Sequence, residues 1–249
     1  MTDSTSAAAG SRPSKGDRTR QRILRAAADL ASIDGLAGLS IAKLADAVGM
    51  SKAGLFAHFG SKEDLQVATV EAARQVVRQA LLPPVVAAPP GLRRLWALCE
   101  SYIHYQASRT FPGGCFFHRN GPEYDVLPVR VRAAIAEAYR TLDGRFVDAA
   151  REAQRLEEIT AEIDSEQLGF ELVAWIREAE RRFLFNRDLG ELNRARTTIR
   201  VRLKGLATPA APPLPAPKRA RKQGSLVRGS RGRKSPGTAS GRNGGRHKG

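Results

Sequence analysis

One segment of the chain, residues 51–62, places small side chains and isolated cations where a helix could present them to a ligand. Leu55 and Phe59 are four residues apart, so on a helix they share one apolar face, which we expect to be buried. The opposite face carries small residues and one cation, namely Lys52, Ala53, Gly54 and Ala57. Small side chains let a helix approach closely, as it must to reach base edges in the major groove of DNA. The alternative is an ordinary solvated face.

The residues around this segment indicate the elements that would hold it. Ser40 and Ser51 are preferred N-cap residues, whose side-chain oxygens accept hydrogen bonds from the first helical turn. Gly49, between them, supplies the positive φ that a tight turn needs. The pattern therefore predicts two short helices joined by a turn. This helix-turn-helix geometry places its second helix in the major groove.

Lys62 is a second informative cation. It lies in the first turn of a helix predicted to begin at Ser61, with Asp64 in a capping-box-like position three residues on. A cation there opposes the helix dipole by about 0.3–1 kcal/mol unless an anion lies between them. A DNA phosphate held by the helix N-terminus and the ammonium together would reverse that sign.

Helical periodicity covers most of the remaining sequence, and no convincing strand pattern appears. We predict an all-α fold: an N-terminal three-helix helix-turn-helix DNA-binding domain followed by an α-helical ligand-binding and dimerisation domain. Helices are expected at about 17–33, 40–48, 51–59, 61–82, 92–108, 128–154, 165–185 and 189–204. The prolines near residues 83–90 predict a linker, and residues 111–122 a loop and a broken segment.

This organisation divides the chain into four parts. We expect a disordered arm at 1–16, the DNA-binding domain at 17–61, the regulatory body at 62–205 and a disordered basic tail at 206–249. The chain carries a net charge of +16, and eleven Lys and Arg residues with no Asp or Glu lie beyond residue 206. Such a tail would bind any duplex through counterion release, or would simply be a solubilising extension.

The composition also predicts where the protein resides. Two cysteines are too few for a disulfide framework and fit a reducing compartment. The first twenty residues lack the hydrophobic segment of a signal peptide, and no apolar stretch approaches the ~20 residues of a membrane span. We therefore expect a cytoplasmic protein that does not enter the membrane.

Several ordered segments match a known family. They read Thr-Arg-Gln-Arg-Ile-Leu, Ala-Ala-Asp-Leu-Ala, Gly-Leu-Ala-Gly-Leu-Ser, Ala-Val-Gly-Met-Ser-Lys and Leu-Phe-Ala-His-Phe-Gly-Ser-Lys-Glu-Asp-Leu, all within residues 19–65. In these segments the chain resembles the tetracycline-repressor (TetR) family of transcription regulators. A weaker likeness to the regulatory domain of some members continues through Phe-Pro-Gly-Gly-Cys at 111–115 and through residues 164–172.

The resemblance assigns further DNA contacts. His58 matches a position that the family uses for phosphate, although a helix-end histidine can instead bond to a backbone carbonyl. Phe56 replaces a common Tyr, which removes a phosphate hydrogen bond but still allows contact with a thymine methyl group. The predicted DNA-binding residues are Arg20, Ser40, Lys43, Ser51, Lys52, Ala53, Gly54, Phe56, Ala57, His58 and Lys62.

One recognition helix reads too few base pairs for a genome-sized search, so we expect a homodimer on a palindromic operator. The helix predicted at 165–185 is apolar on more than one face, and the resemblance implies a four-helix bundle between subunits. The candidate interface residues are Leu168, Leu172, Ile176, Leu192, Ile199 and Leu203. The alternative is that they close the core of a single chain.

The resemblance also implies a cavity for a small effector that releases the repressor from DNA. The candidate pocket residues are Trp96, Tyr102, Tyr105, Cys115, Phe117, His118, Tyr139, Phe146 and Trp175. Most aromatic residues at helical spacing are simply core. Cys115 is a candidate redox sensor or an inert buried thiol.

The sequence was also searched for metal-binding and catalytic motifs. Cys99 and His104 lie about 140° apart on one predicted helix, so they cannot easily share a tetrahedral ion with Cys115 and His118. We therefore predict no metal site and no cofactor. No phosphate-binding loop, nucleophile elbow or metalloprotease helix occurs in the sequence. The acidic pair Glu178 and Glu180 is interpreted as a solvated helix face, and the chain as a regulator, not an enzyme.

Overall fold

The computed structural model describes residues 14–217, and within that range every regular element is a helix. The elements are α1 (Lys15–Asp34), α2 (Ile41–Val48), α3 (Lys52–Phe59), α4 (Lys62–Val86), α5 (Leu92–Ser108), α6 (Phe116–Asn120), the short 3₁₀ turn η1 (Gly121–Glu123), α7 (Val129–Arg155), α8 (Ser165–Asn186) and α9 (Leu189–Leu206). This confirms the predicted all-α fold. None of the described helices is long and apolar enough to cross a membrane.

Local capping explains the short helices of the N-terminal part. The side chains of Ser40, Ser51 and Ser61 each accept a hydrogen bond from a backbone N–H in the first turn of the helix that follows. Gly49 ends α2 in the left-handed conformation with φ of 65°, which an L side chain adopts only with strain. The residues next to the turn between α2 and α3 therefore determine its conformation.

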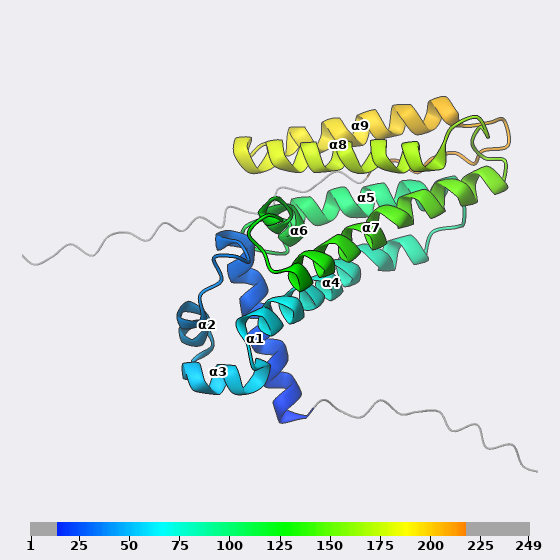
Figure 1. Cartoon of the computed structure of the whole chain (residues 1–249). Helices are drawn as coiled ribbons and strands as arrows, with labels where there is room; N and C mark the ends of the chain where they lie inside the picture. The colour runs from blue at the N-terminus through cyan, green and yellow to red at the C-terminus, as the bar shows by residue number, and fades with distance from the viewer. Residues whose placement is uncertain (1–13, 218–249) are drawn as a thin grey trace, which may run out of the picture.

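The helices form a small head and a larger body (Figure 1). Helices α1, α2 and α3 make up the head, and α4 runs from the head into the body, where it packs against α5 and α7. Helices α8 and α9 form an outer layer on α5 and α7. Large side chains fill the body between these layers, among them Trp96, Tyr102, Phe111, Phe116 and Phe146.

Two predictions about the linkers need correction. Helix α4 continues through Pro83 and Pro84 to Val86, because Leu81 and Val85 on its buried face keep the last turn packed against the body. The segment predicted as a loop and a broken stretch contains α6, whose Phe116 side chain is fully buried. Tertiary packing thus outweighs the local helix-breaking signals at both places.

The predicted terminal segments are only partly described. Residues 1–13 of the arm and 218–249 of the basic tail, including all eleven of its cations, lie outside the described residues. Residues 207–217, predicted to be disordered, instead contact the body. Arg200 donates hydrogen bonds to the carbonyls of Leu214 and Pro215, and the Thr208 N–H donates to the Glu158 carbonyl at 3.1 Å.

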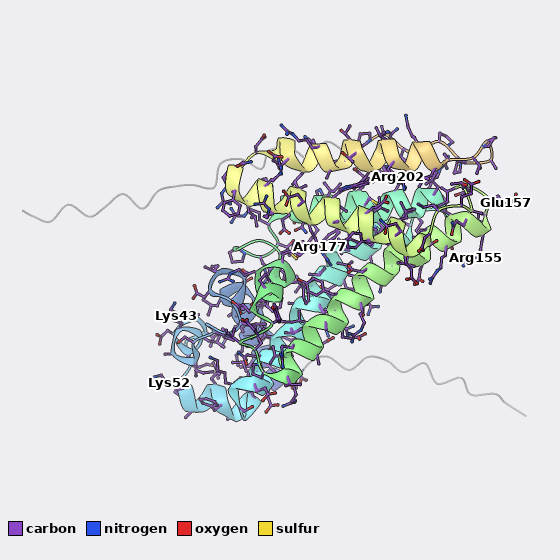
Figure 2. All side chains as sticks on the ribbon, turned by 45° about the horizontal axis from the view of Figure 1, so that its top comes forward. Lys43, Lys52, Arg155, Glu157, Arg177 and Arg202 are labelled. Atoms are coloured by element: carbon purple, nitrogen blue, oxygen red, sulfur yellow. The ribbon has the colours of Figure 1, made fainter. Side chains whose placement is uncertain are left out.

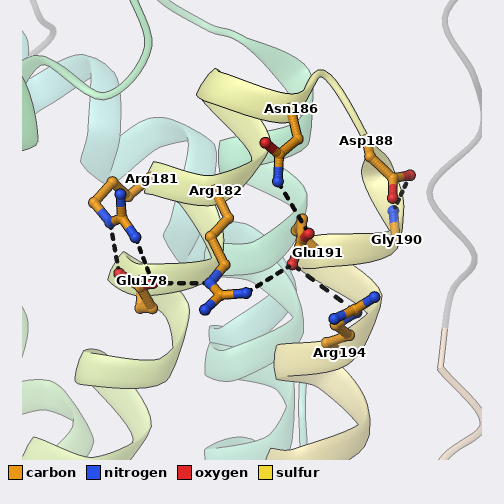
Figure 3. Close-up of polar contacts among 8 residues, drawn as sticks. All are labelled: Glu178, Arg181, Arg182, Asn186, Asp188, Gly190, Glu191 and Arg194. Atoms are coloured by element: carbon orange, nitrogen blue, oxygen red, sulfur yellow. Dashed lines mark hydrogen bonds and ion pairs between the residues drawn. The ribbon is translucent and has the colours of Figure 1, made fainter.

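Charged side chains hold the turn between α8 and α9 (Figure 3). Glu191 lies 3.9 Å from both Arg182 and Arg194 and accepts a hydrogen bond from Asn186 at 3.2 Å. The Asp188 side chain caps α9. These contacts fix the outer layer as one helical hairpin.

Candidate DNA-binding head and sensor site

Helix α3 presents the face that its sequence predicts. Leu55 is fully buried and Phe59 nearly so, whereas Lys52, Ala53, Phe56 and Ala57 are exposed. Gly54 and His58 are half-buried. Lys43 and Lys52 both point outward from the head, away from Arg177 in the body (Figure 2). The head therefore offers small side chains and cations on one solvent-facing surface.

Several predicted DNA-contacting residues already have partners within the chain. The Arg20 guanidinium lies 5.0 Å from the centre of the Phe59 ring, and Lys43 forms an ion pair with Asp34 at 3.0 Å. Such exposed pairs are worth at most about 1 kcal/mol, so both cations remain available to a phosphate. The Ser40 and Ser51 hydroxyls serve as N-caps.

Lys62 also has a partner that its sequence context did not reveal. Its ammonium donates a hydrogen bond to the Ala37 carbonyl at 3.2 Å, in the loop between α1 and α2. The carbonyl dipole offsets part of the unfavourable interaction with the α4 dipole. The side chain is nevertheless exposed and lies at the end of α4 next to the head.

Helix α6 is hydrogen-bonded to the end of α1 through a buried amide. The Asn120 side chain is completely buried, and its Oδ1 accepts a hydrogen bond from the Leu36 N–H at 2.5 Å. Its Nδ2 donates to the Ala31 and Phe116 carbonyls. Because Ala31 and Leu36 flank the end of α1, the Asn120 side chain joins α6 to the head.

Residues on both sides of Asn120 strengthen this connection. The Arg119 side chain donates to the Ile33 carbonyl at 3.3 Å, and the Glu123 carboxylate accepts from the Ala37 N–H at 3.0 Å. On the other side, the Gly113 N–H donates to the Ser32 hydroxyl at 3.0 Å. We call this set of contacts, from Gly113 to Glu123 on one side and Ser32 to Ala37 on the other, the α6–α1 junction.

A buried polar cluster lies at the opposite end of α6. The Cys115 N–H donates to one carboxyl oxygen of Glu180 at 2.9 Å, and His118 Nδ1 contacts the other. His118 Nε2 lies 3.0 Å from the Tyr102 hydroxyl. Cys115 is 5% exposed and Glu180 only 2%. The cluster therefore joins α5, α6 and α8 through polar contacts inside the body.

Glu180 corrects an interpretation made from sequence. Glu178 is exposed and accepts hydrogen bonds from Arg181 and Arg182, which lower its pKa to about 2 (Figure 3). Glu180, two residues on, is buried. It follows Ile176 by four residues and precedes Phe183 by three, so it lies on the apolar stripe of α8. That spacing was the available signal.

Burial sets the protonation of the cluster. It raises the pKa of the Cys115 thiol and raises that of Tyr102 well above its usual value, so both groups stay protonated. Burial, together with the Arg177 guanidinium, lowers the pKa of His118 to about 3. The neutral imidazole donates a hydrogen bond from one ring nitrogen and accepts one at the other. A protonated, buried Cys115 thiol also argues against a reactive thiolate sensor.

A cavity opens beside this cluster, and it takes in part of the predicted pocket. It is lined by Tyr102, Cys115, Phe117 and Tyr139 of the predicted set, together with Val77, Leu81, Leu142, Arg78 and Arg145. The predicted residues Tyr105, His118 and Phe146 lie behind it, with ring centres 6.2–6.3 Å from that of Tyr102. Trp175 is half-buried against the core.

Trp96 does not belong to this cavity. It lines a different one with His104 and Arg196, between α4, α5 and the residues that follow α9. Cys99 is buried in α5 and is not among the residues of the polar cluster.

The apolar residues predicted for a dimer face lie elsewhere. Leu168, Leu172, Ile176, Leu192, Ile199 and Leu203 are all fully buried within one chain. They close the core between α8, α9 and the helices beneath, which corrects their assignment to an interface. The large apolar residues that α8 and α9 expose are Phe170, Phe185 and Val201, at 70%, 77% and 66% exposure.

Comparison with known families accounts for both the head and the body. Residues 23–69 match the family model described as bacterial regulatory proteins of the tetR family. Residues 91–199 match the model of a tetracyclin repressor-like C-terminal domain. The chain belongs to the TetR family of DNA-binding transcription regulators. Family and fold thus indicate a TetR transcription regulator, not an enzyme.

Individual TetR proteins agree with this assignment. The transcriptional regulator AcuR of Cereibacter sphaeroides is 26% identical over 153 residues, which are 60% of this chain and 68% of AcuR. A TetR regulator from Chloroflexus aurantiacus shares the fold with a TM-score of 0.72 and 24% identity, over 78% of this chain and 98% of its own. Reduced NemR from E. coli gives a TM-score of 0.64 at 19% identity, over 76% and 98%.

Proposed function

We propose that this TetR protein is an effector-responsive repressor that binds a palindromic operator as a homodimer. The observation that carries the proposal is the position of α6. One end of this helix takes part in the buried cluster beside the cavity, and the other is hydrogen-bonded to α1 of the head. An occupant of the cavity that shifts α6 would therefore reorient the DNA-reading helix.

The exposed face of α3 is the proposed reading surface. Its small residues allow the helix to sit deep in the major groove, and Lys52 at its N-terminal end reaches base edges or the adjoining phosphate. Lys43, Lys62 and Arg20 surround this face and supply phosphate contacts. The Lys62 ammonium also donates to the Ala37 carbonyl, which holds the α1–α2 loop against α4.

The proposed dimer interface is the outer face of α8 and α9. Phe170 and Phe185 are fifteen positions apart, so they lie about 60° from each other around α8, at its two ends. Exposed aromatic side chains on such a layer are typical anchors of a protein interface. A two-fold pairing there would place the two heads on the same side, as a palindrome requires.

The cavity beside Cys115 is the proposed effector site. Its lining is mainly apolar and aromatic, and its polar residues include Arg74, Arg78, Arg145 and Thr141. This combination favours a small amphipathic molecule that carries an anionic group. A structural relative from Saccharomonospora viridis, with a TM-score of 0.65 and 19% identity over 77% of this chain and 98% of its own, is in complex with choline. The arginines of this cavity would not favour a cation.

The experiment that tests the proposal is selection of duplexes from a random library by the full chain, with excess unrelated DNA present to occupy the basic tail. The proposal predicts a palindromic consensus whose half-sites lie about one helical turn apart, or a multiple of it. Sedimentation of the complex should show an even number of chains per duplex. Enrichment of no sequence, or binding of single chains to half-sites alone, would contradict it.

A further inference from the structure

The cluster of Cys115, His118 and Glu180 has a composition that ordinary core packing does not explain. A thiol, an imidazole and a carboxyl group are brought together from two helices, and both Cys115 and Glu180 are almost completely removed from water. One donor atom of each lies within 4.8 Å of the other two. Sulfur, nitrogen and oxygen donors of these types are the usual protein ligands of Zn²⁺.

The geometry suits one small ion. Cys115 and His118 are three residues apart at the start of α6, so their side chains project on the same side, toward α8, from which Glu180 comes. Zinc-ligand bonds of about 2.0–2.3 Å place neighbouring tetrahedral donors roughly 3.3–3.8 Å apart. The 4.8 Å limit on the separations of the three donor atoms is close to this spacing.

The surroundings already orient two of the three groups. The Glu180 carboxyl is held by the Cys115 N–H at 2.9 Å, and His118 Nε2 lies 3.0 Å from the Tyr102 hydroxyl. If the Nε2–H donates to Tyr102, the Nδ1 lone pair points toward Glu180. Outer partners of this kind fix the tautomer of a metal-binding histidine and are a regular feature of such sites.

The charges of the ligands also match a divalent ion. A thiolate, a neutral imidazole and a carboxylate together carry two negative charges, and a divalent cation cancels both. The bound ion and its ligands therefore carry no net charge in the buried region, where an uncompensated charge is costly.

We propose that Cys115, His118 and Glu180 form a binding site for one divalent transition-metal ion of the Zn²⁺ class. Three protein ligands leave one position of a tetrahedral ion open, as in sites that accept an outside ligand. Because Cys115 also lines the cavity, that position is reached from the cavity. A soft thiolate with an imidazole selects Zn²⁺ or Co²⁺ over Mg²⁺ and Ca²⁺.

The consequence for regulation rests on the proposed repressor function. An ion that links α6 to α8 fixes one end of α6, whose other end forms the α6–α1 junction with the head. Occupancy of the site would thereby change operator affinity. The metal would act alone, or as the anchor of an effector that supplies the fourth ligand.

The test uses Co²⁺ as the spectroscopic probe, titrated into the full chain after chelator treatment and dialysis with a non-thiol reductant. We expect one Co²⁺ per chain, with the thiolate-to-cobalt charge-transfer band and the intense visible bands of a tetrahedral ion. Cys115→Ser should abolish the charge-transfer band. Cys99→Ser, which changes another buried thiol of the same body, should leave the band unchanged. No band in the parent chain, or a band lost with Cys99→Ser and kept with Cys115→Ser, overturns the proposal.

Two near-isosteric variants keep the test valid if Cys115→Ser fails to fold. Glu180→Gln keeps the size of the side chain but removes its charge, and we expect the Co²⁺ affinity to fall by at least about a hundredfold. Tyr102→Phe keeps the ring and removes only the partner of His118, so affinity should fall about 10–100-fold. Unchanged Co²⁺ affinity in both folded variants would overturn the proposal.

A second readout separates the metal site from the repressor function. Operator affinity is measured with Zn²⁺ and with chelator, for the parent and for Glu180→Gln. A zinc-dependent change in the parent alone supports the coupling through α6. A Co²⁺ band with no effect of Zn²⁺ on operator affinity keeps the site and refutes the coupling. A Co²⁺ band in a chain that selects no operator refutes the proposed function and leaves the site standing.

Discussion

The head and the body of this protein bring their functional residues together in different ways. In the head, the reading face of α3 comes from one short segment that is capped by Ser51 and ended at Gly60. In the body, the buried cluster draws Tyr102 from α5, His118 from α6 and Glu180 from α8. The head therefore depends on local capping, whereas the body depends on long-range packing. Changes in the head should alter DNA binding with little effect on stability, whereas changes in the buried parts of the body should lower stability.

The largest effect is expected for Glu180→Ala. The substitution leaves the Cys115 N–H and His118 Nδ1 without a partner in a buried site. We expect the free energy of unfolding to fall by about 3 kcal/mol, measured by urea denaturation. The exposed Glu178→Ala is the matched control and should have little effect. Equal stability of the Glu180 variant and the parent would contradict the buried cluster.

The α6–α1 junction is tested by Asn120→Ala. The buried Asn120 amide satisfies the Leu36 N–H and the Ala31 carbonyl, so its loss should cost about 2 kcal/mol of stability. We also expect operator affinity to change, because this junction positions α1. Gln79→Ala, at an exposed site on α4, serves as the control and should lie within about 0.5 kcal/mol of the parent. If the Asn120 variant matches the parent in both stability and operator affinity, the α6–α1 junction does not position the head.

The outer layer is tested by Phe185→Asp. If Phe185 anchors the proposed interface, its replacement should weaken self-association by roughly 30-fold, which corresponds to about 2 kcal/mol. Val86→Asp changes an equally exposed residue on α4 and should leave the dimer intact. Analytical ultracentrifugation over a range of concentrations measures both. Loss of the dimer with the Val86 variant alone would move the interface away from α8 and α9.

In the head, Lys52→Ala should change specificity more than stability. We expect operator affinity to fall by about tenfold and the preference at the contacted base pair to relax, as for the loss of a groove-facing cation. Fluorescence anisotropy with operator and single-base variants checks this. Unchanged affinity and unchanged base preference would show that Lys52 does not face the groove.

The smallest effect is expected for Lys62→Ala. As a phosphate contact, Lys62 should contribute equally to binding of all DNA sequences, so affinity should fall uniformly. The slope of log affinity against log salt concentration should decrease by about one. Loss of the bond to the Ala37 carbonyl should cost little, because the ammonium is exposed. A change in base preference would contradict this role.

The head was easier to predict from sequence than the body, because local capping forms the head and long-range packing forms the body. The caps at Ser40, Ser51 and Ser61 and the left-handed Gly49 are local signals, and the head follows them closely. Helix boundaries in the body were also predicted well where the apolar stripes are regular, as for α5. Local signals misled at Pro83 and Pro84, because burial of Val85 keeps α4 helical.

Burial itself was the main limit of sequence reasoning in the body. Leu172 and Phe170 are both apolar and lie on the same helix, but the first is fully buried and the second is 70% exposed. The positions of α7 and α9 determine which of the two side chains is buried. Glu180 shows the converse, since an acidic residue beside Glu178 was interpreted as solvated although its helical position places it in the core.

The central claim, that the α3 face reads a specific sequence, is tested most directly by a ratio of affinities. The full chain is titrated, at near-physiological salt, with the selected operator and with a scrambled duplex of equal length. We expect a ratio of about a thousand or more, reduced about tenfold by Lys52→Ala. Equal affinity for both duplexes would contradict it and would leave the basic tail as the source of DNA binding.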